Sequence, residues 1–282
     1  MKKSLLHIFL FPVWILLGSC EGDILPPQHS QMVLEGWIED GGHPIVMLTS
    51  TVPVTEQATS VDSLGEYIIR WARVAVSDGE KTAILSGKYT RDYFPPYVYT
   101  SAAIRGEAGK SYTVTVDYKG QYATASTTIP PSVPLDSVYA ELEDDVDSTY
   151  SIRAVFRHDA AQQRYFKLFT RISGQSMQFY SSFMGLHDCT MLDNPADILV
   201  NSGMSIANLG DYKARFYKGD TVSVKLCTLD EASYRFWYDW EDSENFASNP
   251  FMPSTSNPVS NVKGALGYWC GYGRSVRTII VR

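Results

Sequence analysis

Short segments in which apolar side chains alternate with other residues run through the first half of the chain, and turn-forming residues separate them. Val74 and Val76 follow this spacing, as do Val114 and Val116. A period of two places such residues on one face of a strand, as a half-buried β-sheet requires. The extended segments are 32–38, 45–49, 72–76, 82–85, 112–118 and 122–128. The alternation therefore predicts an all-β architecture for this half.

The number and spacing of these segments favour a sandwich. About seven short strands within about 100 residues, with hairpin turns at Gly79 and Gly120, are typical of an immunoglobulin-like or transthyretin-like fold. Three prolines between residues 130 and 134 then interrupt the pattern, because proline cannot donate a hydrogen bond to a sheet. We therefore predict a β-sandwich over residues 31–130, followed by a stiff linker or a crossover.

Residues 135–282 are expected to form a second, mainly β, sandwich-like part with larger aromatic side chains. Its predicted strands are 137–142, 150–156, 165–172, 222–226 and 275–281. Thr228 and Glu231 have the spacing of a helix capping box, which predicts one amphipathic helix over about residues 229–244. Phe236, Trp237 and Trp240 fall near one face of that helix. A helix packed on the sandwich is favoured over an exposed aromatic site.

The beginning of the chain has the order of a secretory signal. Lys2 and Lys3 precede an apolar stretch over 5–17, which is too short to cross a bilayer as a helix. Small residues and Cys20 follow and resemble the bacterial lipobox, so residues 1–19 are predicted to be removed and Cys20 to carry diacylglycerol and acyl chains such as palmitate. An ordinary signal peptide is the alternative. Acidic residues in the linker 20–30 resemble an export signal to the cell surface.

Charge and aromatic content narrow the classes of partner. The formal net charge is −7, and removal of Lys2 and Lys3 takes it to −9 without leaving a basic cluster, so nucleic acid is excluded as an expected partner. The chain has 18 Tyr, 12 Phe and 6 Trp, of which most are expected in the core and a minority on a binding face. Trp237, Trp240 and Trp269 are the candidate binding aromatics.

Motifs of catalysis or metal binding are not found. Dipeptides containing His158 and His187 are interpreted as surface loops, since neighbouring residues of a strand point to opposite faces. An acidic turn over 143–147 lacks the glycine and the distal glutamate of an EF-hand. We therefore expect no metal, no cofactor apart from the lipid, and no enzymatic activity, although a glycosidase-like carboxylate pair would be recognisable only after folding.

Three cysteines remain once Cys20 is lipidated. Cys189, Cys227 and Cys270 allow at most one disulfide, and spacing leaves its pairing open; three buried thiols are the alternative. Four Asp-Ser/Thr-apolar tripeptides resemble O-glycosylation sites of exported bacterial proteins. These candidate sites are Ser63, Ser137, Ser148 and Thr221.

The last quarter of the chain carries a family resemblance. Asn249-Pro250, the turn-rich segment 256–262 and Gly-Ala-Leu-Gly-Tyr at 264–268 resemble the domain-of-unknown-function 4249 family of outer-membrane lipoproteins. Segments 33–38 and 74–78 are also similar to that family, although Trp71-Ala72-Arg73 departs from its usual Gly-Ala. The resemblance implies a place at the outer membrane near TonB-dependent transporters, and it transfers no catalytic residues.

These observations together predict a lipoprotein anchored in the outer membrane and facing the cell exterior, with a position facing the periplasm as the alternative. It is expected to act without catalysis, as an accessory or ligand-binding partner of a TonB-dependent transporter, with a glycan or a peptide as ligand. A structural or adhesive surface protein is the alternative, and a glycan- or peptide-degrading enzyme is a third.

Overall fold

The computed structural model describes residues 30–51, 62–144, 148–159, 161–175, 177–203, 213–247 and 258–282. The predicted signal peptide, Cys20 and most of the linker therefore lie outside the described residues. Gln31–Arg282 form one compact unit. In its described part, strands predominate and one α-helix is present, which confirms the predicted mainly β fold class. No helix among the described residues has both the length and the apolar composition needed to cross a membrane.

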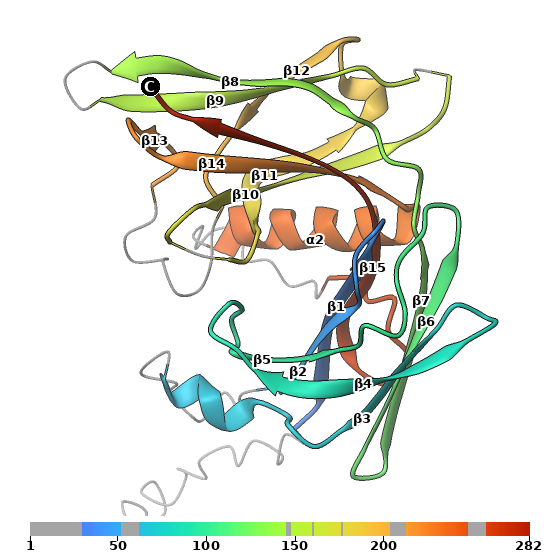
Figure 1. Ribbon diagram of the computed structural model, residues 1–282. Coiled ribbons are helices and arrows are strands. Elements are labelled where there is room, and N and C mark those ends of the chain that lie inside the picture. Colours follow the sequence, from blue (N-terminus) through green and yellow to red (C-terminus); the bar gives the residue numbers. More distant parts are fainter. Residues whose placement is uncertain are drawn as a thin grey trace, which may run out of the picture. The chain divides into compact units, whose positions relative to one another are not determined.

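Two sheets carry the fold, and the larger contains eleven strands (Figure 1). From one edge to the other, its strands are β11 (Tyr180–Asp188), β10 (Tyr165–Ile172), β14 (Thr221–Leu229), β15 (Leu266–Ile280), β1 (Met32–Glu39), β2 (Ile45–Ser50), β5 (Tyr97–Thr100), β4 (Thr82–Tyr89), β3 (Arg73–Ser77), β6 (Ser111–Tyr118) and β7 (Gln121–Thr128). The smaller sheet contains β8 (Leu135–Asp144), β9 (Thr149–Phe156), β12 (Ala196–Val200) and β13 (Phe216–Tyr217). Two 3₁₀ helices, Asp62–Tyr67 and Cys189–Met191, complete the described elements.

The first region of the chain is a sandwich, because the large sheet changes layer along β4. Residues Thr82–Leu85 of β4 pair with β3, whereas Ser86–Tyr89 pair with β5. The two layers enclose one hydrophobic core, in which Val74 lies opposite Val116 and Val76 opposite Val114 in the β3–β6 register. The valine alternation in the sequence therefore identified the buried face of these strands.

The second region is also layered. The small sheet packs against β10 and β14, and the core between them includes Ile152, Phe156, Phe166, Phe216 and Leu226. Four of the strands in the described part of the chain were not predicted: β5, β11, β12 and β13. They are short, or they lack regular alternation: β11 contains adjacent serines and a glycine, and its pairing with β10 is interrupted by an irregularity after Lys167.

Strand β15 serves both regions (Figure 1). It pairs in parallel with β1 through Tyr272, and from Gly273 onward it pairs antiparallel with β14. The sequence predicted only the second part of this strand, because the glycines before it resemble turn formers. A Cβ on Gly273 would collide with the carbonyl oxygen of Pro130, so glycine is what lets the proline-rich segment cross directly over β15. The segment is thus a crossover packed on the strand that both regions share.

Helix α2 (Glu231–Ala247) begins two residues later than predicted. Asp230, rather than Thr228, caps its first turn: an Asp230 side-chain oxygen accepts a hydrogen bond from the backbone N–H of Ser233 at 2.8 Å. The other Asp230 oxygen accepts one from the Thr127 hydroxyl at 2.9 Å, which ties the helix start to β7. Thr228 instead belongs to β14. The helix covers the opposite face of β10, β14 and β15 from the core of the second region, and a third, aromatic core forms beneath it.

Candidate functional site

A cavity of about 840 Å³ lies beside this third core. Strands β1, β10, β11, β14 and β15, helix α2 and the loop Asp92–Phe94 contribute its walls. Its size falls within the range of pockets that hold small molecules, about 300–1,000 Å³. The aromatic side chains of the lining are Trp37, Tyr93, Phe94, Phe169, Phe179, Tyr180, Phe183, Phe236, Trp237, Trp240, Tyr268 and Tyr272.

Alternation along the strands explains how charged residues reach this cavity. On β1, Glu35 and Glu39 line it, whereas Leu34 and Ile38 point into the core of the first region. On the β10–β14 pair, Phe169 lies opposite Lys225 and shares its face of the sheet. One face of each strand thus supplies packing, and the other supplies charges and rings to the cavity.

Lys225 is the centre of a buried ion-pair network. Its ammonium pairs with one Glu39 carboxylate oxygen, and the other oxygen lies 3.0 Å from Arg274 Nη1. The rings of Phe169, Phe179 and Tyr272 surround the same ammonium at 4.9, 4.7 and 5.9 Å from their centroids. This is the geometry of a cation–π cage, in which aromatic faces stabilise a cation removed from water.

The ionisation of this network follows from its burial and its charges. Burial alone would raise the pKa of the Glu39 carboxyl, but Lys225 and Arg274 outweigh it and the pKa is lowered. Burial would likewise lower the pKa of Lys225, and Glu39 reverses the effect, so the pKa of the ammonium is raised. Both partners are therefore held in their charged forms.

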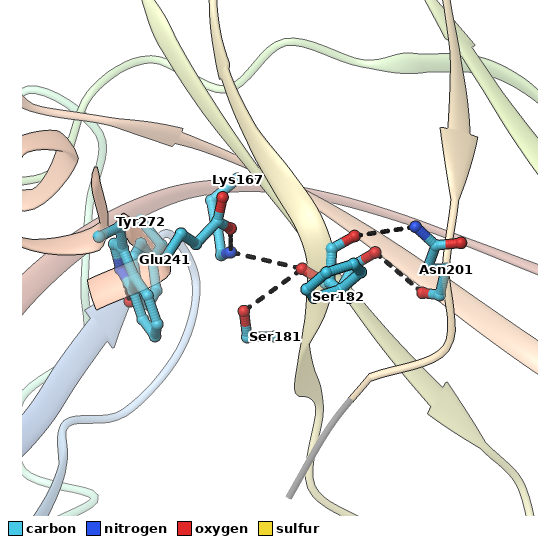
Figure 2. Close-up of polar contacts among 8 residues, drawn as sticks. Lys167, Ser181, Ser182, Asn201, Glu241 and Tyr272 are labelled. Atoms are coloured by element: carbon cyan, nitrogen blue, oxygen red, sulfur yellow. Dashed lines mark hydrogen bonds and ion pairs between the residues drawn. The ribbon is translucent and has the colours of Figure 1, made fainter. Parts of the chain in front are cut away.

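A second ion pair, between the buried Lys167 and the half-buried Glu241, joins β10 to the helix. Figure 2 shows the Lys167 ammonium between the Glu241 carboxylate and the backbone carbonyl of Ser182, with which it makes a 3.5 Å hydrogen bond. The same ammonium lies 5.0 Å from the ring of Trp237. The Ser182 hydroxyl in turn donates to the Asn201 carbonyl oxygen at 2.8 Å. These bonds fix helix α2 and strand β11 on the two sides of Lys167.

Glu35, which is half-buried, differs from Glu39 and Glu241. Tyr268 on β15 donates its hydroxyl to a Glu35 oxygen at 2.6 Å. Every lysine and arginine beyond Lys3 has a described side chain, and none of them forms an ion pair with Glu35. Burial raises the pKa of this carboxyl, and the Tyr268 hydrogen bond only partly opposes the rise.

The three candidate tryptophans have different positions. Trp237 and Trp240 line the cavity, as a binding role requires, and Trp237 Nε1 donates to the Tyr272 hydroxyl at 3.2 Å. Trp269 is fully buried in the core of the first region, where its Nε1 donates to the Tyr112 carbonyl oxygen at 3.0 Å. Its assignment as a binding aromatic was wrong, because alternation along β15 turns Tyr268 and Tyr272 toward the cavity side and Trp269 away from it.

The three cysteines are free thiols in the structure and all are buried. Cys227 and Cys270 belong to the aromatic core, and Cys189 belongs to the core of the second region. The candidate disulfide is therefore not formed, and the alternative of buried thiols describes these residues. Burial raises the pKa of Cys270 to about 12 and raises that of Cys227 further, so both carry their proton.

The histidines interpreted as loop residues are not on the surface. His158 is buried with its Nε2 at 3.3 Å from the Asp193 carbonyl oxygen, and His187 lies within β11. His187 Nε2 is buried and has no hydrogen-bond partner among the described residues. Burial and the nearby Lys167 ammonium lower the pKa of His187 to about 4, so its ring is neutral at pH 7. In the described part of the chain, no three His, Cys, Asp or Glu side chains are grouped to hold a metal ion.

The candidate glycosylation sites are distributed outside the cavity. Ser137 on β8 and Ser148 in the turn after it are exposed, and Thr221 at the start of β14 is half-buried. The side chain of Ser63, like Asp145 and Asp147 of the acidic turn, lies outside the described residues.

Sequence reasoning missed the charged residues of the cavity. Lys167 and Lys225 each stand inside a predicted strand, at positions where an apolar side chain would be expected, and Glu35 and Glu39 flank Trp37 at the alternate positions of β1. A charged residue within a buried strand requires a partner of opposite charge. That requirement was the signal in the sequence that pointed to buried ion pairs.

Comparison with known proteins identifies the family. No curated protein is significantly similar to the chain. The family model described as Domain of unknown function (DUF4249) matches residues 23–278, which include every described strand and the helix, apart from the last residues of β15. The chain therefore belongs to the DUF4249 family.

Proposed function

We propose that this protein is a lipid-anchored outer-membrane protein that captures a small ligand in its aromatic cavity, as a non-enzymatic partner of a TonB-dependent transporter. The observation that carries the binding role is the cavity of about 840 Å³, which aromatic side chains line from both regions of the chain. Such a volume accommodates a drug-sized molecule, a short oligosaccharide or a few residues of a peptide.

Rigidity of the lining supports a binding role. The Lys225–Glu39–Arg274 network joins β14, β1 and β15, and the Lys167–Glu241 pair joins β10 to α2. Each ammonium is in addition held against aromatic rings. Side chains that are fixed before binding lose little conformational entropy when a ligand enters, which favours affinity.

The state of the ionisable groups favours binding over chemistry. Glu39 and Glu241 are engaged by lysines, so neither is an available general acid or base. Cys227 and Cys270 are buried with raised pKa values and would be poor nucleophiles. These four groups are therefore held in place or inert, and the aromatic rings make up most of the surface that a ligand would meet.

Attachment and partner rest on the sequence. The lipobox-like segment ending at Cys20 supports lipid anchoring, and the acidic residues behind it support exposure at the cell surface. The outer membrane and the transporter follow from the family resemblance. A ligand captured at the surface would be released to a transporter that spans the same membrane.

Binding by the cavity can be tested with N-phenylnaphthylamine, a neutral probe that fluoresces in apolar surroundings. The full chain would carry Cys20→Ser, so that no acyl chains compete for the probe. We expect one probe per chain and energy transfer from tryptophan, since Trp37, Trp237 and Trp240 line the cavity. Ser181→Trp, which fills the cavity from β11, should weaken binding about tenfold or more, whereas Thr82→Trp on the exposed face of β4 should not.

Two results would contradict the binding role. One is that the fluorescence of the probe does not saturate, and the other is that the Ser181→Trp variant binds the probe as tightly as the chain that keeps Ser181. The transporter role is tested separately, by purifying the lipidated chain from detergent-solubilised membranes of its own host. A TonB-dependent transporter should co-purify, and its consistent absence would overturn that part of the proposal.

A further inference from the structure

Three glutamates lie at the cavity, of which Glu39 is buried and Glu35 and Glu241 are half-buried, and two of the three have a lysine of their own. Glu39 is paired with Lys225 and Glu241 with Lys167, and in both pairs the ammonium also lies over an aromatic ring. Glu35 also lines the cavity, and it is bonded to the hydroxyl of the aromatic Tyr268 rather than to a lysine or arginine. Among the described residues it is therefore the one of these three glutamates without a cation.

No lysine or arginine among the described residues forms an ion pair with Glu35. Glu35 and Glu39 are four residues apart on the same face of β1, which separates their backbones by about 13 Å. Lys225 is committed to Glu39, and Lys167 to Glu241. A carboxylate removed from water without a counter-charge is costly, and the raised pKa of Glu35 is the expected consequence.

Aromatic rings stand beside this carboxylate. The Tyr268 ring, whose hydroxyl bonds to Glu35, is centred 4.6 Å from Phe236 and 5.4 Å from Trp237. Trp240 continues the group at 6.2 Å from Phe236, and all four rings line the cavity. Aromatic faces next to a carboxylate attract organic cations through both the ring quadrupole and the charge.

We infer that the cavity takes a ligand with a positively charged amine, which pairs with the Glu35 carboxylate and packs against the Phe236–Trp237–Trp240–Tyr268 rings. The inference rests on the proposed binding function and specifies its ligand class. An ammonium at this place would complete the third ion pair, and the apolar remainder of the ligand would occupy the rest of the cavity.

An anionic ligand is the competing outcome, because Arg171 also lines the cavity and forms no ion pair with a described carboxylate. Its guanidinium is already engaged: it lies 4.6 Å from the Phe179 ring and donates to the Met177 carbonyl oxygen at 3.4 Å. An arginine is ionised at any relevant pH and tolerates partial exposure. Glu35 has a raised pKa and forms no ion pair with a described lysine or arginine, so it is the less satisfied of the two groups.

Three probes of similar size separate these outcomes at pH 8: phenethylamine, phenethyl alcohol and hydrocinnamate, which are cationic, neutral and anionic. Each is measured by its displacement of N-phenylnaphthylamine from the full Cys20→Ser chain. We expect phenethylamine to bind at least about tenfold more tightly than the alcohol, as a charge-assisted hydrogen bond in a partly dry site allows, and hydrocinnamate to bind more weakly than both.

Glu35→Gln keeps the shape of the side chain and an acceptor for Tyr268, so it should leave binding of N-phenylnaphthylamine intact and bring phenethylamine to the affinity of the alcohol. Glu107→Gln removes a surface carboxylate that pairs with Lys110, and it should retain the full preference for the amine. Tyr268→Phe removes the hydroxyl and leaves the carboxylate, so the preference should persist there too.

The failures are distinguishable. Equal affinity for amine and alcohol, a preference for hydrocinnamate, or a preference for the amine that survives Glu35→Gln would each overturn the inference while the binding function stands. Failure of N-phenylnaphthylamine and of all three probes to bind would overturn both.

Discussion

Two hydrophobic cores meet at strand β15, and they differ in the kinds of side chain that form them. The core of the first region holds aliphatic side chains such as Leu34, Val74 and Val114 around the fully buried Trp269. The core under helix α2 holds Phe236, Trp237, Tyr268 and Tyr272, with buried lysines and glutamates at its edge and a cavity beside it. Tyr268 and Trp269 are neighbours in the chain and belong to different cores.

The difference shows what each core contributes. The described residues of the aliphatic core are buried apolar side chains, and burial of apolar surface is the contribution that stabilises a fold most directly. Buried ion pairs contribute little net stability, because desolvation opposes their attraction. The burial of Lys167 and Lys225 beside a cavity is therefore consistent with the ligand-binding role proposed above.

Trp269→Ala should give the largest effect. The side chain is fully buried and its indole N–H is bonded to Tyr112, so its removal leaves a large hole and should lower the free energy of unfolding by about 3–5 kcal/mol. Trp240→Ala should cost less than about 1 kcal/mol, since Trp240 is 41% exposed, yet it should weaken probe binding. Urea denaturation of both variants measures the contrast, and similar losses would erase the distinction between the two cores.

Lys225→Met should be nearly as damaging. It leaves Glu39 buried with Arg274 as its remaining partner, and we expect a loss of about 3 kcal/mol in the free energy of unfolding. Adding Glu39→Gln should recover part of the loss, because the uncompensated carboxylate is then removed. The coupling energy from the double-mutant cycle is the measurement, and strictly additive losses would show that the two side chains act independently.

Acid should weaken the fold through His187. Its pKa in the folded chain is lowered to about 4 from 6.5, first by burial and then by Lys167. The unfolded chain binds a proton below pH 6.5 and the folded chain does not, so stability falls as the pH drops from 6.5 to about 4, by about 2–3 kcal/mol. His187→Leu should remove this part of the decline in urea denaturation, whereas His43→Gln, at an exposed histidine, should retain it. An unchanged decline in His187→Leu would refute the assignment.

The smallest effect concerns the two glutamates of β1, which should respond to pH in opposite directions. Because the pKa of Glu39 is lowered on folding, its carboxylate adds to the free energy of unfolding above pH 4.5. This contribution is lost as the pH falls through the pKa that Glu39 has in the folded chain. Because the pKa of Glu35 is raised on folding, its protonated carboxyl adds to the free energy of unfolding below pH 4.5. This contribution is lost as the pH rises through the pKa that Glu35 has in the folded chain. Glu39→Gln should flatten the acid side of the stability profile and Glu35→Gln the side above pH 4.5. Profiles that change in the same direction would contradict the pairing described for Glu39 and Glu35.

Much of the fold could be predicted from local pattern. The strands at Val74–Val76 and Val114–Val116 and the boundaries of β10 followed from spacing alone, since alternation depends on neighbouring residues. The helix was placed within about three residues of its ends, and the error arose because Asp230 is as good a cap as Thr228. The unpredicted strand β11 has no regular alternation, so its pairing with β10 is a tertiary choice.

The site was predictable only in part. Trp237 and Trp240 were identified by their place on one helix face, but the same reasoning selected Trp269, whose environment depends on which partners β15 finds. Glu35 and Glu39 come from β1, Lys167 from β10 and Lys225 from β14, up to about 200 residues apart in the chain, and no local signal joins the three strands.

The sequence by itself determined that the chain is mainly β, where most strands and the helix lie, and which residues alternate between two faces. Only the tertiary structure decided that β15 serves both regions, that Tyr268 and Trp269 enter different cores, and that Glu35 lacks the lysine that Glu39 and Glu241 have. Alternation follows from the geometry of one strand, whereas the partner of a buried charge is settled by contacts between strands that are distant in sequence.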